Sequence, residues 1–516
     1  MKTVEARTIA VVGAIGICLI TAAWNYSALL AWRHDELLPR AGQVEGPLRV
    51  SVIVCLIYLF LIFLIDVTLL VVAVSENAVL TRQSRAESYD TIARSRFTIP
   101  VSVIVPMRNE EILALPVIQA LLELDYPELE VIVVNDGSTD RTLDLLSTKY
   151  ALQANARFQR PIVPTEEVHA VYRSGADQRL TVVDKVGGGK ADALNCGLNF
   201  ARFRYVCCVD GDTMYDRDAL LRSMRLVLRD PATVIGVTSQ IVVAVNPERS
   251  LQSDGLARNE LLQNFQHMEY LRAFLNDRLA WSRLGFMLCA SGAFALYRRD
   301  VLEELGGFSR DFSCEDIELT FRIHESFLRQ GRPYRILAMP DPVARTEGPN
   351  RISGLVSQRA RWQRVMLETT WHYRKMILNP RYGTVGLVGL PFYVLSEVVA
   401  PFGEAVALVT LAVAVAFGVV TWHEYFLALG VMSFANAALT AAAIRLEDVG
   451  TRSYRIRDLA WLIALSPFEL FLYRPMLFWA HMRGVVGFFR GEKTWERFDR
   501  NARPVGEAPL PAPALE

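Results

Sequence analysis

Long runs of apolar residues lie near both ends of the chain. Residues 9–32 and 50–74 are each long enough to cross a bilayer core, which takes about 20 apolar residues in a helix, and Asp66 is the charged residue in the second run. A cleaved signal peptide is the alternative for the first run, but that run is too long and no small-x-small cleavage site follows it. The pattern therefore predicts a transmembrane hairpin.

Basic residues around this hairpin indicate its orientation. Four arginines follow the second run with little acid among them: Arg82, Arg85, Arg94 and Arg96. Basic residues accumulate on the cytoplasmic side of membrane proteins. We therefore expect the hairpin to start and end in the cytoplasm.

The C-terminal part has three more apolar runs, at residues 387–420, 425–444 and 459–489. The segments 445–457 and 490–503 are basic, and both favour the cytoplasmic side. That requires an even number of crossings between them, so we expect 459–489 to be a short hairpin rather than one broken helix. Ionisable residues at this depth face a protein interior or a wet path by default. Those in the three runs include Glu397, Glu404, Glu469 and Arg474.

Between about residues 99 and 380, short strand-like runs alternate with amphipathic stretches of helix length, which is typical of α/β domains. The expected strands are 101–105, 131–134, 181–183 and 205–209. A helix is expected to open at 108–111, because the two acids there suit the first turn of a helix. Residues 151–180 are interpreted as an insertion that the pattern does not place.

Residues 246–286 have the periodicity of one long amphipathic helix or two consecutive helices. The apolar stripe consists of Leu261, Phe265, Met268, Leu271, Leu275 and Leu279. A stripe of this kind packs against a sheet or lies on a membrane surface, and the stripe alone does not decide between them. We favour packing against the sheet.

Composition narrows the function classes. The chain has 516 residues, of which 52% are hydrophobic, and its formal net charge is zero, so nothing points to nucleic acid. The seven cysteines are scattered without the spacing of a metal site or a disulfide framework. This favours a reducing compartment for the part outside the membrane.

Asp210 and Asp212 follow the apolar run 205–209, with one glycine between them. At the carboxyl end of a parallel strand, side chains project into the crevice where ligands bind. Two carboxylates there repel each other unless a cation lies between them, and hard divalent ions take oxygen ligands and share them with phosphates. A surface turn is the alternative, since Asp-Gly is common in turns.

Two other polar features follow expected strands. Asp136 opens a turn of glycine, serine and threonine, which lets a nucleotide come close. Lys190 follows three glycines, so that backbone amides and an ammonium group can approach phosphate. The spacing is not that of a Walker loop.

Two helical motifs complete the set. Glu315 and Asp316 follow Cys314 and open a helix, where acids are also favourable for the dipole alone. Gln358 and Arg361 are three residues apart on one helix face, with Trp362 beside them. Such a face could clamp a pyrophosphate and stack a sugar.

The order of these motifs resembles that of the family 2 inverting glycosyltransferases. More narrowly, it resembles the membrane-embedded processive synthases of cellulose, hyaluronan, chitin and poly-N-acetylglucosamine. The resemblance covers roughly residues 97–380 and rests on Val101-Ser-Val-Ile-Val-Pro with Asn109-Glu110, Asn135-Asp136-Gly-Ser, Gly189-Lys190 with Ala193-Leu194-Asn195, Asp210-Gly-Asp212, Glu315-Asp316 and Gln358-x-x-Arg361-Trp362. It implies an α/β GT-A fold, a Rossmann-like nucleotide-sugar-binding domain, inserted between helical transmembrane segments.

The resemblance also implies roles. Asp316 would be the general base, and Asp210 with Asp212 would hold Mg²⁺ or Mn²⁺. The donor UDP-sugar would be bound by Asp136, at the uridine, and by Lys190, Asp210, Gln358, Arg361 and Trp362. The acceptor glycan would be bound by Ser291, Gly292, Glu315 and Trp362. Displacing a diphosphate with inversion needs a base on the acceptor hydroxyl and positive charge at the leaving group, and these residues could supply both.

The expected organisation follows from the motifs and the apolar runs. It is a transmembrane hairpin at 1–80, a catalytic domain at 97–355, interfacial helices at 356–385, a transmembrane bundle at 386–490 and a cytosolic tail at 491–516. We expect an inner-membrane protein with a cytosolic catalytic domain, whose partners are the bilayer and export or envelope proteins. No room is expected for a cyclic-dinucleotide-binding domain after the last run.

Some alternatives stay open. A transferase that adds one sugar to a lipid carrier would share Asp136 and the Asp-Gly-Asp turn, but it would usually lack the Gln358 motif. A transporter or scaffold with an inactive nucleotide-binding domain would have lost an acidic motif, and none is lost here. Cys314 stands where the family often has threonine. The motifs do not distinguish UDP-glucose from UDP-N-acetylglucosamine as the donor.

Overall fold

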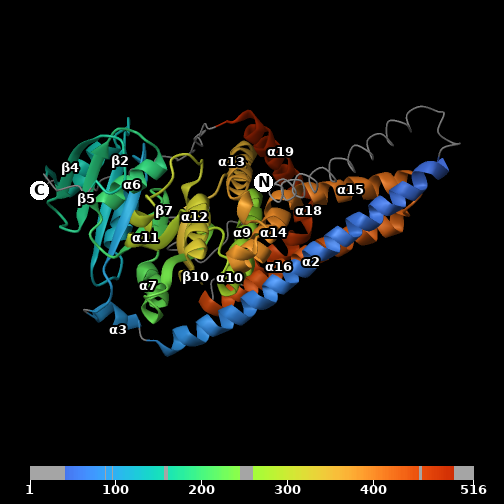
Figure 1. Ribbon diagram of the computed structural model, residues 1–516, viewed down its shortest axis with the longest axis horizontal. Coiled ribbons are helices and arrows are strands. Elements are labelled where there is room, and N and C mark those ends of the chain that lie inside the picture. Colours follow the sequence, from blue (N-terminus) through green and yellow to red (C-terminus); the bar gives the residue numbers. More distant parts are fainter. Residues whose placement is uncertain are drawn as a thin grey trace, which may run out of the picture.

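The structure, a computed structural model, describes residues 41–87, 89–95, 97–155, 161–244, 260–451 and 456–492. The apolar run 9–32 and the tail after residue 492 lie outside the described residues. The described chain forms a domain built on a mixed sheet, on the left of Figure 1, and a bundle of apolar helices that extends to the right.

The described strands form one ten-stranded sheet in the order β3-β4-β5-β2-β1-β6-β9-β8-β10-β7. The strands are β1 (Val101–Met107), β2 (Leu129–Asp136), β3 (Leu152–Ala154), β4 (Val168–Ser174), β5 (Leu180–Lys185), β6 (Tyr205–Val209), β7 (Thr213–Tyr215), β8 (Val234–Ala244), β9 (Phe294–Arg298) and β10 (Arg335–Glu347). The four strands expected from the sequence are confirmed as β1, β2, β5 and β6, and they are mutually parallel neighbours. Beyond β6 the sheet turns mixed, because β9 runs antiparallel to both β6 and β8.

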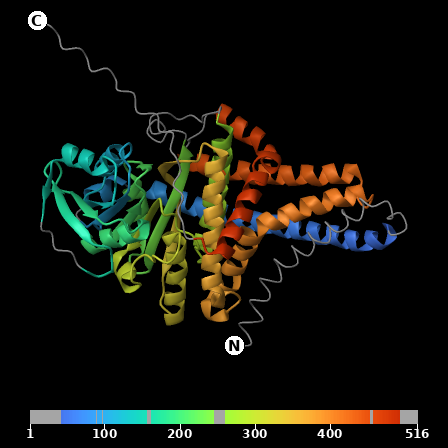
Figure 2. The ribbon, with the colours of Figure 1, turned by 90° about the horizontal axis from the view of Figure 1, so that it is seen from above.

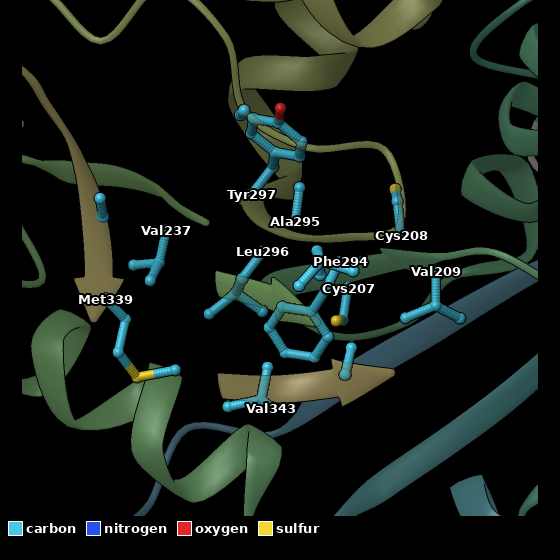
Figure 3. Close-up of a cluster of buried hydrophobic side chains, with 14 of the residues drawn as sticks. Cys207, Cys208, Val209, Val237, Phe294, Ala295, Leu296, Tyr297, Met339 and Val343 are labelled. Atoms are coloured by element: carbon cyan, nitrogen blue, oxygen red, sulfur yellow. The ribbon is translucent and has the colours of Figure 1, made fainter. Parts of the chain in front are cut away.

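Both faces of this sheet are covered, which is why its central strands are apolar without alternation. In β9, Phe294 and Leu296 point to one face, where they meet Val343 of β10, while Tyr297 points to the other (Figure 3). The register pairs Cys207 with Leu296. Cys207 is fully buried and packs as a small hydrophobic residue.

The helices around the sheet are α3 (Tyr89–Arg94), α4 (Ala114–Leu122), α5 (Thr142–Tyr150), α6 (Lys190–Phe200), α7 (Ala219–Arg229), α11 (Arg299–Glu304) and α12 (Glu315–Gln330). The prediction that a helix opens at 108–111 is wrong, since α4 begins at Ala114. Asn109 has a left-handed backbone with φ of +54°, and its side chain accepts a hydrogen bond from the Thr139 amide at 2.7 Å. The loop is therefore held against the β2 turn before the helix can start.

The segment that the pattern did not place, 151–180, extends the sheet at its edge. β3 and β4 pair antiparallel with each other, and β4 pairs antiparallel with β5. Residues 156–160 lie outside the described part of the chain. The described remainder therefore widens the sheet beyond the parallel strands.

The long amphipathic stretch is described from residue 260 on and consists of α9 (Leu261–Leu271), the π-helix η1 (Arg272–Arg278) and α10 (Leu279–Leu284). Its stripe is buried from Phe265 to Leu279, whereas Leu261 is exposed. α9 packs on β8, and α10 packs on β10 and on α2 (Ala41–Ala86). Packing against the sheet is confirmed for this part.

Within the described residues, three helices are long and apolar enough to cross a membrane: Glu45–Ser84, Val385–Ala416 and Trp422–Glu447. The first lies in α2. The second comprises η4 (Val385–Gly389), α14 (Leu390–Tyr393), η5 (Val394–Val399) and α15 (Ala400–Ala416), and the third lies in α16 (Trp422–Thr451). α2 packs against both α15 and α16, and all three extend away from the sheet (Figure 2).

Residues 456–490 differ from the expected hairpin. They form a broken helix made of α17 (Ile456–Leu465), the 3-10 turn η6 (Ser466–Phe468), α18 (Glu469–Leu472) and α19 (Arg474–Arg490). The 10 residues of α17 span only about 15 Å, half of a hydrocarbon core of about 30 Å. Prolines lie in the first turns of η6 and α19, where the missing amide is tolerated.

α19 packs along α13 (Ile352–His372), between the sheet and the spans (Figure 1). A β-carbon at Gly484 would lie 2.5 Å from the carbonyl oxygen of Ala360, so only glycine permits this approach. The 3-10 turns η2 (Arg374–Met376) and η3 (Pro380–Tyr382) connect α13 to η4. α13, the helix with the Gln358 motif, is thereby fixed between the sheet and the bundle.

Candidate active site

The candidate site lies at the carboxyl ends of the parallel strands, the edge at which open α/β sheets bind ligands. Asp136 ends β2, Lys185 ends β5, and the two residues are register partners. Asp210 follows β6 directly. Residues from separate parts of the chain therefore meet at one edge of the sheet.

Asp136 is buried and holds the glycine-rich loop. One carboxylate oxygen accepts a hydrogen bond from the Gly188 amide and the other from the Gly189 amide, each at 2.8 Å. Gly137 has φ of +66°, and a β-carbon there would lie 2.7 Å from the Gly187 nitrogen. The two turns are thus in backbone contact, and glycine is required for it.

Lys185 is a residue of this site that the sequence motifs missed. Its side chain is fully buried, with Nζ 2.8 Å from Asp136 and 2.5 Å from Asp192. Burial tends to lower the pKa of Lys185, but the hydrogen bonds to the two carboxylates outweigh burial and raise it. The signal in the sequence was a lysine at the end of an apolar strand, which needs a buried counter-charge.

Lys190 opens α6 and joins two of the expected site residues. Its Nζ lies 2.7 Å from Asp210 and 3.0 Å from Glu315. Burial tends to lower the pKa of Lys190, but nearby negative charge outweighs burial and raises it well above its usual value. The carboxylates responsible are Asp210, Glu315 and Asp316.

The Asp210–Asp212 turn is fixed by close backbone packing. A β-carbon at Gly211 would lie 2.8 Å from the carbonyl oxygen of Pro106, at the end of β1. The hydroxyl of Tyr215 accepts a hydrogen bond from the Asp210 amide at 3.0 Å. Burial raises the pKa of Asp210 to about 6, with the charge of Asp212 adding to it and that of Lys190 opposing it.

Asp316 lies in the first turn of α12. The Gly292 amide donates to one of its carboxylate oxygens at 2.8 Å, and the Ile317 amide donates to the other at 2.8 Å. Burial, followed by the charge of Glu315, raises the pKa of Asp316. A β-carbon at Gly292 would lie 2.9 Å from both Asp316 and Lys190, so glycine lets the two side chains face the same loop.

Ser291, the other residue expected on the acceptor side, belongs to the same loop. Its amide donates to the Thr238 hydroxyl of β8 at 3.1 Å. The Tyr215 hydroxyl lies 2.9 Å from the carbonyl oxygen of Ala293. Tyr215, which the motifs also missed, therefore ties this loop to the Asp210 turn.

The motif on α13 approaches the site through Arg361, whose Nη1 lies 3.2 Å from the sulfur of Cys314. Cys314 is the N-cap residue of α12, directly before Glu315 and Asp316. Gln358 accepts a hydrogen bond from Arg359 at 2.9 Å, and the ring of Trp362 lies 6.3 Å from that of Tyr270. The structure thus brings Arg361 to the helix of Asp316 and places Trp362 beside α9, while Gln358 is bonded to Arg359 on its own helix.

The oxygen atoms of Asp210 and Asp212 fit a hard divalent cation by their chemistry. Within the described residues, no group of three or more His, Cys, Asp or Glu side chains is arranged to hold a metal ion. The Thr213 hydroxyl donates to Asp212 at 3.2 Å, which orients that carboxylate. A cation here would complete its coordination with ligands from elsewhere, such as phosphate oxygens.

The mixed sheet, the glycine-rich loop, the paired aspartates and the buried carboxylate at the start of α12 are the arrangement expected of a glycosyltransferase with a GT-A fold. Residues 99–365, more than half of the chain, match the family described as Glycosyltransferase like family 2. The chain belongs to this family and is a glycosyltransferase.

Among curated proteins, the chain is similar to two staphylococcal poly-beta-1,6-N-acetyl-D-glucosamine synthases. The protein from Staphylococcus epidermidis is 28% identical over 276 residues, covering 52% of this chain and 56% of that protein. The protein from Staphylococcus aureus (strain COL) is 26% identical over 275 residues, covering 53% and 55%. The chain thus spans about half the length of the curated relatives it matches.

Two solved structures are also similar. The mannosyltransferase PcManGT from Pyrobaculum calidifontis, in complex with GDP-Man and Mn²⁺, is 21% identical with a TM-score of 0.45, covering 79% of this chain and 99% of that chain. Residues 1–349 of S. aureus TarS, in complex with UDP-GlcNAc, are 18% identical with a TM-score of 0.35, covering 78% and 94%.

Proposed function

We propose that the protein is a processive inverting β-glycosyltransferase that polymerises a hexose or N-acetylhexosamine from a UDP-sugar and moves the product across the inner membrane. The observation that carries this is the position of Lys190, 2.7 Å from donor-side Asp210 and 3.0 Å from Glu315, the neighbour of Asp316. The ammonium group of Lys190 therefore lies between the proposed donor side and the proposed acceptor side of the site. Because of the two staphylococcal relatives, UDP-N-acetylglucosamine is the first donor to test.

In the proposed reaction, Asp316 takes the proton of an acceptor hydroxyl while that oxygen bonds to the anomeric carbon of the donor. The bond from this carbon to the diphosphate oxygen breaks on the opposite face, which inverts the configuration. UDP leaves with the electron pair, and the charges of Lys190 and Arg361 stabilise it. The raised pKa of Asp316 strengthens it as a base.

We assign Asp210 and Asp212 to Mg²⁺ or Mn²⁺, with Asp212 as the direct ligand. Such a cation, when bound, supplies positive charge at the diphosphate. Asp136 serves the uridine side, where it orders the amides of Gly188 and Gly189. A β-carbon at Gly189 would meet nothing within 4 Å, so the loop is open to a nucleotide at that position.

We assign the acceptor to the side of the site formed by Ser291, Gly292, Glu315 and Trp362. Gln358, Arg361 and Trp362 hold the pyrophosphate and the first acceptor sugar between them. An indole ring beside a sugar suits stacking, because its face is apolar and its edge can remain wet. The acceptor therefore enters from α13, on the bundle side of Asp316.

For translocation we propose a polar route through the bundle. Arg272 of η1 pairs with Glu469 of α18 at 2.6 Å, and Arg474 of α19 pairs with Glu404 of α15 at 2.9 Å. Ionisable side chains at such depth in a membrane protein usually line a protein interior or a wet path. A hydrated glycan needs hydrogen-bonding groups of this kind along its way.

The organisation expected from the sequence is part of the proposal: membrane segments at 1–80 and 386–490, a catalytic domain at 97–355 and interfacial helices at 356–385, with the tail at 491–516 in the cytosol. The broken helix at 456–490 does not supply the two crossings of the expected hairpin, since α17 is too short to cross a membrane alone. Arg82 and Arg94 after the first described span favour a cytosolic catalytic domain.

The proposed function is tested with the full-length protein purified in nanodiscs. Radiolabelled UDP-N-acetylglucosamine and UDP-glucose are supplied separately with Mn²⁺ or Mg²⁺, and the product is sized and digested with linkage-specific glycosidases. We expect a polymer from one donor that needs the added cation. A single labelled sugar on lipid, or no transfer from either donor, would contradict the proposal.

Asp212→Asn, with Asp218→Asn as the matched control, links the activity to the assigned site. Asp218 pairs with Arg222 on α7 and has a side chain that is 39% exposed. We expect synthesis to fall by about 10²–10³-fold in Asp212→Asn, as when a main electrostatic group is removed. Asp218→Asn should retain wild-type synthesis, and equal losses in both variants would argue against the metal assignment.

A further inference from the structure

Arg359 is an unassigned position inside the Gln358–Trp362 motif, yet its guanidinium is among the most buried charged groups of the described chain. Only 2% of the residue is exposed. It lies next to Gln358 in sequence and three residues before Trp362, so that it shares a helix face with the tryptophan. A buried guanidinium needs partners for its charge and its five donors.

Two of those partners are the motif residues themselves. Nη1 of Arg359 donates to the side-chain oxygen of Gln358 at 2.9 Å. The guanidinium carbon lies 4.0 Å from the centre of the Trp362 ring, in cation–π contact. One planar group therefore contacts both Gln358 and Trp362 and restricts the rotamers of both.

The other side of Arg359 is anchored in a different part of the fold. Nη2 donates to Oε2 of Glu269 on α9 at 2.7 Å. The hydroxyl of Tyr473, between α18 and α19, donates to the same oxygen at 2.5 Å. The ring of Tyr473 stacks on Phe265 of α9. The orientation of Arg359 is thus set by the helices that border the bundle.

We propose that Arg359 is a positioning residue that holds Gln358 against the pyrophosphate and Trp362 against the acceptor sugar. This rests on the proposed function, because it assumes that the motif binds those groups. Lysine cannot replace it, since an ammonium group lacks the planar fork that bonds Gln358 and Glu269 while it stacks on the indole. Glu269 is the counter-charge that keeps this fork in place.

The test is Arg359→Lys in the full-length protein in nanodiscs, with polymer synthesis and UDP-sugar hydrolysis by water both measured. We expect kcat for synthesis to fall by about tenfold or more, since a displacement of about 1 Å at a reacting centre can lower a rate by about 10²-fold. Hydrolysis, which needs no acceptor sugar, should change less, and the polymer should be shorter. Wild-type kcat and polymer length would overturn the inference.

Arg225 provides a matched control. It is also buried, lies 5.6 Å over the ring of Tyr89, and pairs with Asp341 at 3.5 Å, away from the site. Arg225→Lys should lower thermal stability as Arg359→Lys does but leave the ratio of synthesis to hydrolysis unchanged. The same change of ratio in both variants would show a general packing effect and overturn the inference.

Glu269→Gln serves if Arg359→Lys does not fold, because glutamine still accepts from Arg359 but removes the charge. A smaller loss of synthesis in the same direction supports the inference, and an unchanged ratio overturns it. Failure of the proposed function is visible separately. In that case the wild type itself makes no polymer, whereas failure of this inference leaves an active wild type and an equally active Arg359→Lys.

Discussion

Two lysines flank the glycine-rich loop and make the same kind of contact with different consequences. Lys185 bridges Asp136 and Asp192 and is 0% exposed. Lys190 bridges Asp210 and Glu315, and 21% of its side chain is exposed. Lys185 with its partners belongs to the interior of the fold, whereas Lys190 faces residues that we propose for the transfer reaction.

The difference comes from where the backbone places each lysine. Lys185 is the last residue of β5, so its side chain enters the packed edge between β2 and α6. Lys190 is the first residue of α6, at the open side of the loop. Residue type alone therefore does not identify a lysine that can face a substrate; its burial and the identity of its partners do. Substitutions at the two lysines, and at the loop that faces Lys190, should have different effects on stability and on synthesis.

The largest effect is expected for Lys185→Met. It removes the buried ammonium group that pairs with both Asp136 and Asp192, and breaking a buried pair in this way costs about 3–5 kcal/mol. We expect a strongly lowered unfolding temperature for the catalytic part, with UDP binding lost because the Asp136 loop is no longer held. Thermal denaturation of the purified protein measures the unfolding temperature. A melting curve like that of the wild type would show that Lys185 does not stabilise the fold.

Lys190→Met should behave in the opposite way. Its side chain is partly exposed, so the fold should tolerate the change. Synthesis should fall by about 10²–10³-fold, because the variant lacks the charge that we propose stabilises the leaving diphosphate. Steady-state rates with saturating UDP-sugar, alongside the melting curve, measure the contrast. Similar profiles for the two lysine variants would contradict the division of roles.

A smaller effect is expected for Gly292→Ala. The added β-carbon would lie 2.9 Å from Asp316 and from Lys190, so one side chain must move by some tenths of an ångström. Overpacking of this kind typically costs about 1–3 kcal/mol. We expect this cost to appear as a lower rate of synthesis, measured at saturating UDP-sugar. Gly306→Ala, where a β-carbon meets nothing within 4 Å, tests whether any added methyl is harmful, although its φ of +79° adds strain of its own.

The sequence predicted the parallel strands and the Asp210–Asp212 turn because a strand buried on both faces has to be apolar along its length. It failed at α4, since the left-handed Asn109 gave no signal apart from its residue type. It also failed at 459–489, where charge balance favoured a hairpin and the prolines instead broke the helix.

The missed site residues have a common cause. Lys185 and Tyr215, and Arg359 in its proposed positioning role, contact partners that are far away in the sequence. Tyr215 contacts Ala293 across 78 positions, and Arg359 contacts Glu269 across 90. Spacing rules recognise groups that a single turn or helix brings together. Contacts between distant elements are settled only when the whole sheet and bundle are packed.

The central claim is that Asp316 serves as the base in the same site that binds the nucleotide. It is tested most directly by measuring UDP binding and polymer synthesis in Asp316→Asn, which keeps the hydrogen bond from Gly292 possible. We predict a loss of synthesis of about 10²–10⁴-fold, the usual contribution of general-base catalysis, with the Kd for UDP nearly unchanged. Retained synthesis, or a loss of UDP binding equal to the loss of synthesis, would contradict the assignment of Asp316.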